Sequence, residues 1–225
     1  ISSRGSSCWP KVRPDAQSRT RLQTVTIMIS LETAITTLHA QRTDQVVVTT
    51  MGSAREWMRL DPHPLDFHFV PSSMGQAPAV GLGIALSQPA RRIIVCNGDG
   101  CLLMNLGTLV TIAAQAPANL TLLTFDNGMF EVTGGQSTAA SPASRTRSNP
   151  VDFCNLARSC GFTHVEHFTQ LETWKDGIDG ILSAPGPVYA HLSIDPVPGA
   201  VGPRSPGPAP QRAQRFSEAL TAELD

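Results

Sequence analysis

The 225-residue chain lacks the features that would assign it to several broad classes of protein. Its net charge is −1, so it has no positive surplus with which to bind a nucleic acid or an anionic membrane surface. No apolar run approaches the roughly 18 residues of a membrane span, and the first residues lack the basic and apolar regions of a secretory signal. The five cysteines form no C-x-x-C pair, and an odd number of scattered thiols favours a reducing compartment. We therefore expect a cytoplasmic protein without a membrane or nucleic-acid partner.

What the chain does have is enough apolar sequence for one sizeable domain, with 41% hydrophobic and 16% charged residues. Strand-like and helix-like patterns alternate along it. The predicted strands are residues 46–50, 67–70, 93–96, 120–125, 162–168 and 188–194. The predicted helices between and around them are residues 74–86, 102–114, 150–160 and 171–182, preceded by a helix near Met28 with Ser30 as its N-cap. This alternation predicts an α/β fold with a doubly wound, mainly parallel six-stranded sheet.

The composition also divides the chain into segments. Residues 1–27 are rich in Ser, Arg and Pro, and we expect them to be disordered or to lie outside the natural sequence, with Met28 as the natural start. Residues 28–195 form the predicted main domain. Residues 196–212 read as a Pro- and Gly-rich linker, and residues 213–225 as an amphipathic C-terminal helix.

Two polar turns follow the third and fourth predicted strands. The first is Gly98-Asp99-Gly100, and the second contains Asn127, 28 positions after Asp99. Either turn alone is more often only a turn, but together, at strand ends and with a helix between them, they form a specific pattern. Because ligands of open α/β sheets bind beyond the carboxyl ends of the strands, we expect both turns to face one ligand.

The residue types in these turns suit a hard cation that carries a phosphorylated ligand. Asp99 would supply a carboxylate oxygen to Mg²⁺ and Asn127 an amide oxygen. Gly98 and Gly100 allow the main chain to come close to a diphosphate. The helix that begins near Cys101 adds free N–H groups at its start.

This pair of turns resembles the cofactor motif of the thiamine diphosphate enzymes. The resemblance implies that Asp99 and Asn127 bind Mg²⁺ through their side chains and that Met129 binds it through its backbone carbonyl. The segment Pro71 to Gln76 resembles the loop Gly-Ser-Met-Gly of the same family, with Met74 and Gly75 in the matching positions.

By this resemblance, Met74 props thiamine diphosphate in its bent form; the alternative is an ordinary core methionine. The Ser72 carbonyl would face the amine of the pyrimidine ring. Ser72 stands where the family has glycine, which matters little if only the backbone is used.

Two further segments narrow the resemblance. Thr133-Gly134-Gly135-Gln136 and the sequence from Cys101 to Leu109 look like those of the sulfopyruvate and phosphonopyruvate decarboxylases, as does the segment from Thr49 to Glu56. The resemblance covers about residues 28–224. It implies a carboxy-lyase that converts a small 2-oxoacid into an aldehyde and carbon dioxide.

The resemblance also implies a missing part. In this family a glutamate on a pyrimidine-binding domain activates the cofactor, and the segment before Met28 is too short for a domain of that kind. We therefore expect a β-type subunit that forms a hetero-oligomer with a pyrimidine-domain α subunit. Two alternatives stay open: the cofactor-binding β subunit of a 2-oxoacid:ferredoxin oxidoreductase, and a non-catalytic cofactor-binding subunit.

Other residues carry weaker signals. Gly81-Leu82-Gly83 lies in an apolar helical pattern and is better explained by helix packing than by dinucleotide binding. His63 and His68 are candidates for substrate contacts, although a lone histidine is more often structural. Arg55 is a candidate partner for an anionic substrate group, with a surface salt bridge as the equal alternative.

Overall fold

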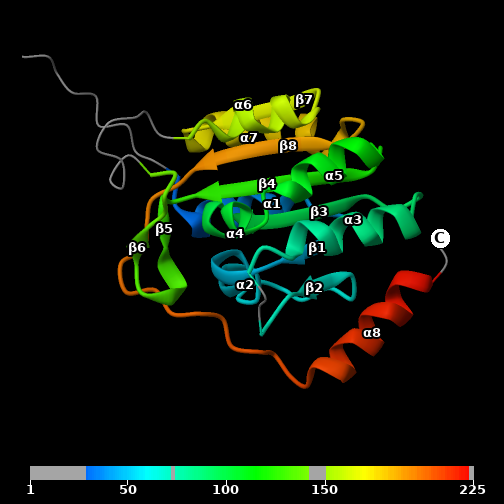
Figure 1. Ribbon diagram of the computed structural model, residues 1–225. Helices are drawn as coiled ribbons and strands as arrows, with labels where there is room; N and C mark the ends of the chain where they lie inside the picture. Colours follow the sequence, from blue (N-terminus) through cyan, green and yellow to red (C-terminus); the bar gives the residue numbers. More distant parts are fainter. Residues whose placement is uncertain (1–28, 72–73, 142–150, 223–225) are drawn as a thin grey trace, which may run out of the picture.

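The computed structural model describes residues 29–71, 74–141 and 151–222, and it contains a parallel sheet with helices on both faces (Figure 1). The strand order is β2-β1-β3-β4-β8-β7, and every neighbouring pair is parallel. The strands are β1 (Val46–Thr49), β2 (Asp66–His68), β3 (Ile93–Gly98), β4 (Leu120–Asp126), β7 (His164–Phe168) and β8 (Val188–Ser193). The predicted six-stranded α/β sheet is therefore confirmed.

Helices cover both faces of this sheet. One face packs against α1 (Leu31–Gln41), α2 (Met51–Trp57) and α7 (Leu171–Ser183). The other packs against α3 (Ala77–Ser87), α4 (Asp99–Met104), α5 (Gly107–Gln115) and α6 (Phe153–Cys160). A short antiparallel hairpin, β5 (Met129–Phe130) and β6 (Gln136–Ser137), follows β4 and encloses the 3₁₀ helix η1 (Glu131–Thr133). None of the helices in the described ranges is long and apolar enough to cross a bilayer.

Alternate residues of the inner strands β1, β3, β4 and β8 fill two separate cores, one on each face of the sheet. On β3, Val95 belongs to the core under α3 and α5, whereas Ile94 and Cys96 belong to the core under α1 and α7. Both tryptophans of the described residues, Trp57 and Trp174, are fully buried in the second core. The central strands are thus buried on both faces, as their continuous apolar sequence requires.

Several helix boundaries follow local signals. Ser30 caps α1 as predicted, since its Oγ accepts a hydrogen bond from the Thr33 amide at 3.1 Å. Helix α3 begins at Ala77 and not at residue 74, because Gly75 has φ +85°, a conformation that no helix contains. Gly161 ends α6 in the left-handed conformation, as predicted.

Two helices differ from the sequence prediction. The single helix predicted over 102–114 is two helices, α4 and α5, because Asn105 leaves the helical conformation and donates a hydrogen bond from Nδ2 to the Gly75 carbonyl at 3.3 Å. The seven-residue helix α2 was not predicted, since so short a segment carries almost no periodic pattern.

The C-terminal helix α8 (Ala209–Thr221) begins four residues before the predicted position. Its Phe216 packs against Phe67 beside β2, with ring centroids 5.0 Å apart. Arg212 donates hydrogen bonds from Nη1 to the His68 carbonyl at 2.8 Å and from Nη2 to the Val70 carbonyl. This helix is therefore attached to the segment that leads into the predicted cofactor loop. The predictions for residues 1–27, Met28, Ser72 and Pro150 lie outside the described residues.

Candidate functional site

Parallel strand pairing brings the two polar turns to the same edge of the sheet. The register pairs Gly98 at the end of β3 with Phe125 near the end of β4. Asp99 follows the first of these residues directly, and Asn127 follows the second by two positions. Both side chains line one pocket, whose empty volume including the part open to solvent is ≈ 490 Å³.

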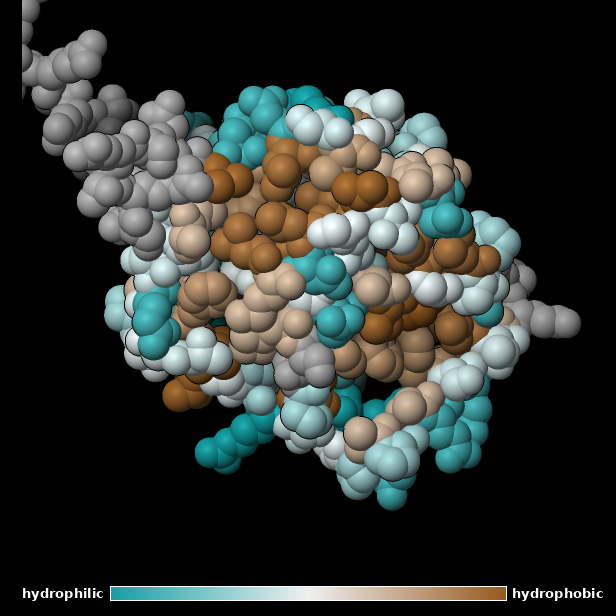
Figure 2. All heavy atoms as spheres, in the orientation of Figure 1, coloured by the Kyte–Doolittle hydropathy of each residue, from teal (hydrophilic) through white to brown (hydrophobic). Residues whose placement is uncertain are grey.

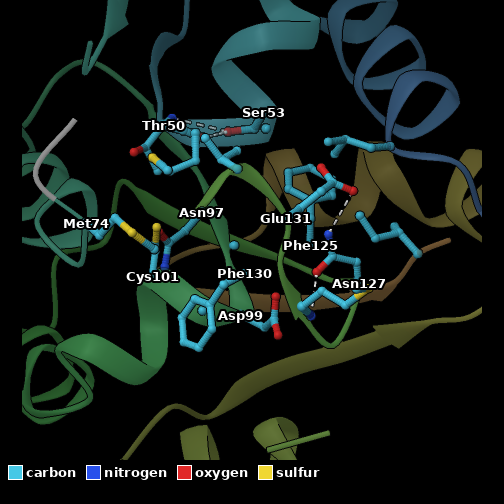
Figure 3. A pocket seen from close by; sticks show the side chains of 18 of the residues that line it. Thr50, Ser53, Met74, Asn97, Asp99, Cys101, Phe125, Asn127, Phe130 and Glu131 are labelled. Carbon is cyan, nitrogen blue, oxygen red and sulfur yellow. Dashed lines mark hydrogen bonds between the residues drawn. The ribbon is translucent and has the colours of Figure 1, made fainter. Parts of the chain in front are cut away.

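The pocket gathers most of the predicted site residues. Figure 3 shows Met74, Asn97 and Cys101 on one side and Asp99, Asn127 and Glu131 on the other. The predicted residues that line it are Met74, Gly98, Asp99, Gly100, Cys101, Asn127 and Met129. Gly75 is next to Met74 but outside the lining, packed against α4, where an added Cβ would lie 3.2 Å from Cβ of Met104. Ser72 is outside the described residues.

Asp99 is a buried carboxyl group with few partners. It is 2% exposed, and it accepts a hydrogen bond from Thr138 Oγ1 at 3.2 Å. Burial, together with the nearby charge of Asp126, raises the pKa of Asp99 to about 7. A cation beside this group would favour its charged form, so the environment suits a metal ligand.

Asp126, one residue before Asn127, has the opposite environment. Its Oδ2 accepts a hydrogen bond from Nε2 of His191 at 3.0 Å, and its Oδ1 accepts one from the Gly128 amide at 2.9 Å. Burial alone would raise the pKa of Asp126, but the hydrogen bond and charge of His191 and the Gly128 amide outweigh it and lower the pKa. Of the two neighbouring carboxyl groups, Asp126 is therefore the one that holds the negative charge.

The amide of Asn127 is oriented by two hydrogen bonds. Its Oδ1 accepts one from the Met129 amide at 2.9 Å, and its Nδ2 donates one to Glu131 Oε1 at 3.2 Å. Glu131 is itself fixed, since its Oε2 lies 3.3 Å from Nη2 of Arg55 and its Oε1 accepts a bond from the Val197 amide at 2.6 Å. The oxygen of Asn127 keeps a second lone pair for a further partner.

Three features test whether these residues fit a cofactor with a metal. Asn97 is fully buried and lines the pocket, yet neither its Oδ1 nor its Nδ2 has a partner among the described residues. A bound polar ligand would satisfy it. Asp99 and Asn127 offer only oxygen atoms to a metal, as Mg²⁺ prefers. At Gly100 an added Cβ would lie 2.7 Å from the Phe130 ring, so glycine keeps this turn open. The residues fit the implied cofactor and metal.

Some residues of the pocket were not predicted from the sequence. They are Asn97, the apolar Leu31, Phe130 and Ile194, the α2 start at Thr50 to Ser53, and Glu131. The sequence could have indicated Glu131 as a site residue, because it lies four residues after the predicted ligand Asn127. It gave no such indication for the apolar residues, since they come from distant segments that only the fold brings together.

The weaker candidates lie outside the pocket lining. His63 contacts Arg42, and His68 Nδ1 lies 2.9 Å from Thr49 Oγ1. Arg55 pairs with Glu56 at 2.6 Å and with Glu131. In this arrangement its charge holds Glu131 in place.

Comparison with known proteins agrees with this geometry. Residues 46–192 match the family described as thiamine pyrophosphate enzyme, C-terminal TPP binding domain. The chain is 42% identical over 154 residues to phosphonopyruvate decarboxylase of Streptomyces viridochromogenes, covering 68% of this chain and 36% of that protein. It is 38% identical over 154 residues to sulfopyruvate decarboxylase subunit beta of Methanothermobacter thermautotrophicus, covering 68% of this chain and 75% of that protein.

A solved structure, the 2-oxoglutarate:ferredoxin oxidoreductase of Magnetococcus marinus, shares the fold with a TM-score of 0.61 at 19% identity, over 76% of this chain and 62% of that one. The chain thus spans about a third of the length of the Streptomyces relative and three quarters of the archaeal one. The match to the family runs from β1 into β8 and includes both polar turns. The chain belongs to the thiamine pyrophosphate enzymes, of which it carries the C-terminal cofactor-binding domain.

Proposed function

We propose that this chain is the diphosphate-binding subunit of a thiamine diphosphate-dependent decarboxylase of 3-sulfopyruvate or 3-phosphonopyruvate. The observation that carries the proposal is the pairing of Asp99 and Asn127, from neighbouring strands, in one pocket with Met74. The relatives named phosphonopyruvate decarboxylase and sulfopyruvate decarboxylase support the choice of substrate class.

Each site residue has a defined role in this proposal. Mg²⁺ would be held by the side chains of Asp99 and Asn127 and by the Met129 carbonyl. The backbone of Gly98, Gly100 and Cys101 would lie along the diphosphate.

Two more roles concern the rest of the cofactor. Met74 would support the bend of the cofactor, with Gly75 next to it in the chain. The apolar Leu31, Phe130 and Ile194 would keep water from the buried end of the pocket. When bound, thiamine diphosphate supplies the electron-accepting ring that allows a 2-oxoacid to lose carbon dioxide.

A separate pyrimidine-binding subunit would complete the active site. Three of the relatives are named sulfopyruvate decarboxylase subunit beta, which supports a two-subunit enzyme. Figure 2 shows apolar side chains gathered on the face that carries α3, α4 and α5. There Leu86, Met104 and Val110 are 50%, 53% and 55% exposed. An apolar surface of this kind suits contact with another subunit.

The test is to purify the chain alone and together with a pyrimidine-domain protein encoded beside it. We expect Mg²⁺-dependent binding of thiamine diphosphate by the complex and release of an aldehyde from one of the two acids. Asp99→Ala and Asn127→Ala should abolish both, because each removes an oxygen ligand. Gly83→Ala, at an exposed position on α3, is the matched control.

Three outcomes would contradict the proposal. Rapid turnover by the chain alone would exclude the need for a partner. Reduction of an electron acceptor that depends on coenzyme A would favour the oxidoreductase alternative. Binding of the cofactor by the complex without turnover of any 2-oxoacid would favour a non-catalytic subunit.

A further inference from the structure

A second cluster of chemically active side chains lies on the other side of Asp126 from the cofactor pocket. His167 on β7 and His191 on β8 are direct neighbours in the parallel register, and their ring centroids are 4.6 Å apart. Cys154 on α6 lies over them. One ring nitrogen of each histidine and Sγ of Cys154 all lie within 4.8 Å of one another. Both histidines line a pocket of ≈ 1430 Å³, including the part open to solvent.

We propose that Cys154, His167 and His191 form a binding site for a Zn²⁺-type cation, distinct from the proposed Mg²⁺ site. A thiolate and two imidazoles are the ligands that Zn²⁺ prefers, whereas Mg²⁺ prefers oxygen ligands. The proposal depends only on these three residues and their neighbours, and it holds whether or not the chain is a decarboxylase.

The hydrogen bonds around the histidines prepare them for a metal. Nε2 of His191 donates to the Asp126 carboxylate at 3.0 Å, which leaves Nδ1 with a free lone pair. Nε2 of His167 lies 2.9 Å from Ser193 Oγ, so the ring of His167 can adopt the same tautomer, with its proton on Nε2. Histidines that bind zinc usually donate their other ring N–H to a carboxylate or a carbonyl, which fixes the tautomer and the orientation of the ring. Asp126 would have this role here.

The three ligand atoms, which lie within 4.8 Å of one another, would have to move only slightly closer together to bind one ion. Ligand atoms around a tetrahedral Zn²⁺ lie about 3.3–3.6 Å apart, given its usual bond lengths. His167 is exposed, so its ring can move toward the other two groups without disturbing the core. Three protein ligands leave a fourth position for water or a small anion, as in zinc sites that are open to ligands.

The thiol sets the condition for binding. Sγ of Cys154 donates a weak hydrogen bond to the Glu166 carbonyl at 3.7 Å. Burial and the charge of Asp152 raise the pKa of Cys154 to about 11. Because cysteine binds Zn²⁺ as the thiolate, metal binding should release the proton of this thiol.

The test is a titration of the whole protein with Co²⁺, a spectroscopic substitute for Zn²⁺, in the presence of excess Mg²⁺. We expect one equivalent to bind with a thiolate-to-cobalt charge-transfer band and with the intense visible bands of a four-coordinate ion. Zn²⁺ should displace it. Cys154→Ser should remove the charge-transfer band. Cys160→Ser, on the same helix, is the matched control and should keep it.

His167→Gln gives an independent variant, because an exposed side chain is not needed for folding. Loss of a group that only orients a metal ligand typically weakens metal binding by roughly 10–100-fold. Loss of the ligand His167 itself should weaken the binding of Co²⁺ by at least as much. Absence of the band in the wild-type protein would overturn the proposal. A band that survives Cys154→Ser, or that disappears with Cys160→Ser, would overturn it too, since the metal would then lie elsewhere.

Discussion

Nδ2 of Asn127 donates a hydrogen bond to Oε1 of Glu131 at 3.2 Å, and this contact decides which way the Asn127 amide faces. Because Glu131 holds the nitrogen, the oxygen is left for the Met129 amide and a further partner. The Arg55 side chain and the Val197 amide hold Glu131 in turn. A residue outside the predicted metal ligands therefore orients one of them.

Glu131→Ala should weaken the binding of Mg²⁺ with thiamine diphosphate by about 10–100-fold, the usual effect of losing a partner that orients a metal ligand. Glu131→Gln should have a smaller effect, since its amide oxygen can still accept the bond from Asn127. Isothermal titration calorimetry of the complex measures both. Equal affinities for the wild type and Glu131→Ala would show that Asn127 needs no orienting partner.

Without Mg²⁺, the contribution of Asp99 to the free energy of unfolding should fall as the pH rises from about 4 to about 7. The pKa of Asp99 is raised from 3.8 to about 7, so the native state holds this proton more tightly than the unfolded state. That stabilisation is complete below the unfolded pKa and is lost as the pH rises through the native one.

Asp99→Asn should remove this part of the pH dependence, because the amide does not titrate. Asp179→Asn, at an exposed position on α7, is the control and should leave it unchanged. Urea denaturation in EDTA across this pH range measures the effect. The same slope in the wild type and in Asp99→Asn would place the titrating group elsewhere.

Gly81→Ala and Gly83→Ala, two positions apart on α3, should have opposite effects on stability. An added Cβ at Gly81 would overlap Cγ2 of the buried Val95, so the helix, the strand or the Val95 side chain must shift, at a cost of about 1–3 kcal/mol. At Gly83 nothing lies within 4 Å, and the better helix propensity of alanine should add up to about 1 kcal/mol. Chemical denaturation of both variants checks this, and a stable Gly81→Ala would contradict the close packing of α3 on β3.

Arg212→Ala should destabilise the protein by about 1.5–3 kcal/mol for each lost hydrogen bond from its charged group. The bonds to the His68 and Val70 carbonyls attach α8 to the end of β2. Arg215→Ala, an exposed change on the same helix, should have almost no effect. Limited proteolysis, together with thermal melting, should show α8 released only in the first variant. Equal melting temperatures would mean that the other contacts of α8, such as the packing of Phe216, hold the helix without Arg212.

The sequence predicted the parts of this site that depend on local pattern. Asp99 and Asn127 were found because each follows a continuous apolar strand, and parallel pairing then brings strand ends together. Asn97 and Glu131 were missed, since the first reads as the end of a strand and the second acts only after the hairpin β5–β6 folds back over the pocket.

The proposed cation site shows even more clearly how little of a site can be predicted when its residues are far apart in the sequence. Cys154, His167 and His191 are spread over 38 positions and share no motif. Only the register of β7 on β8 and the position of α6 bring them together. Strand register depends on long-range packing, which a single sequence shows only weakly.

The placement of Trp57 and Trp174 determines what fluorescence can report about this protein. Both lie in the core under α1 and α7, and no tryptophan of the described residues lies in the core under α3 and α5. Emission from these two side chains therefore reports the loosening of the core under α1 and α7. It does not report the loosening of the core under α3 and α5. Where the emission and the far-ultraviolet circular dichroism change at different denaturant concentrations, the two faces of the sheet unfold separately.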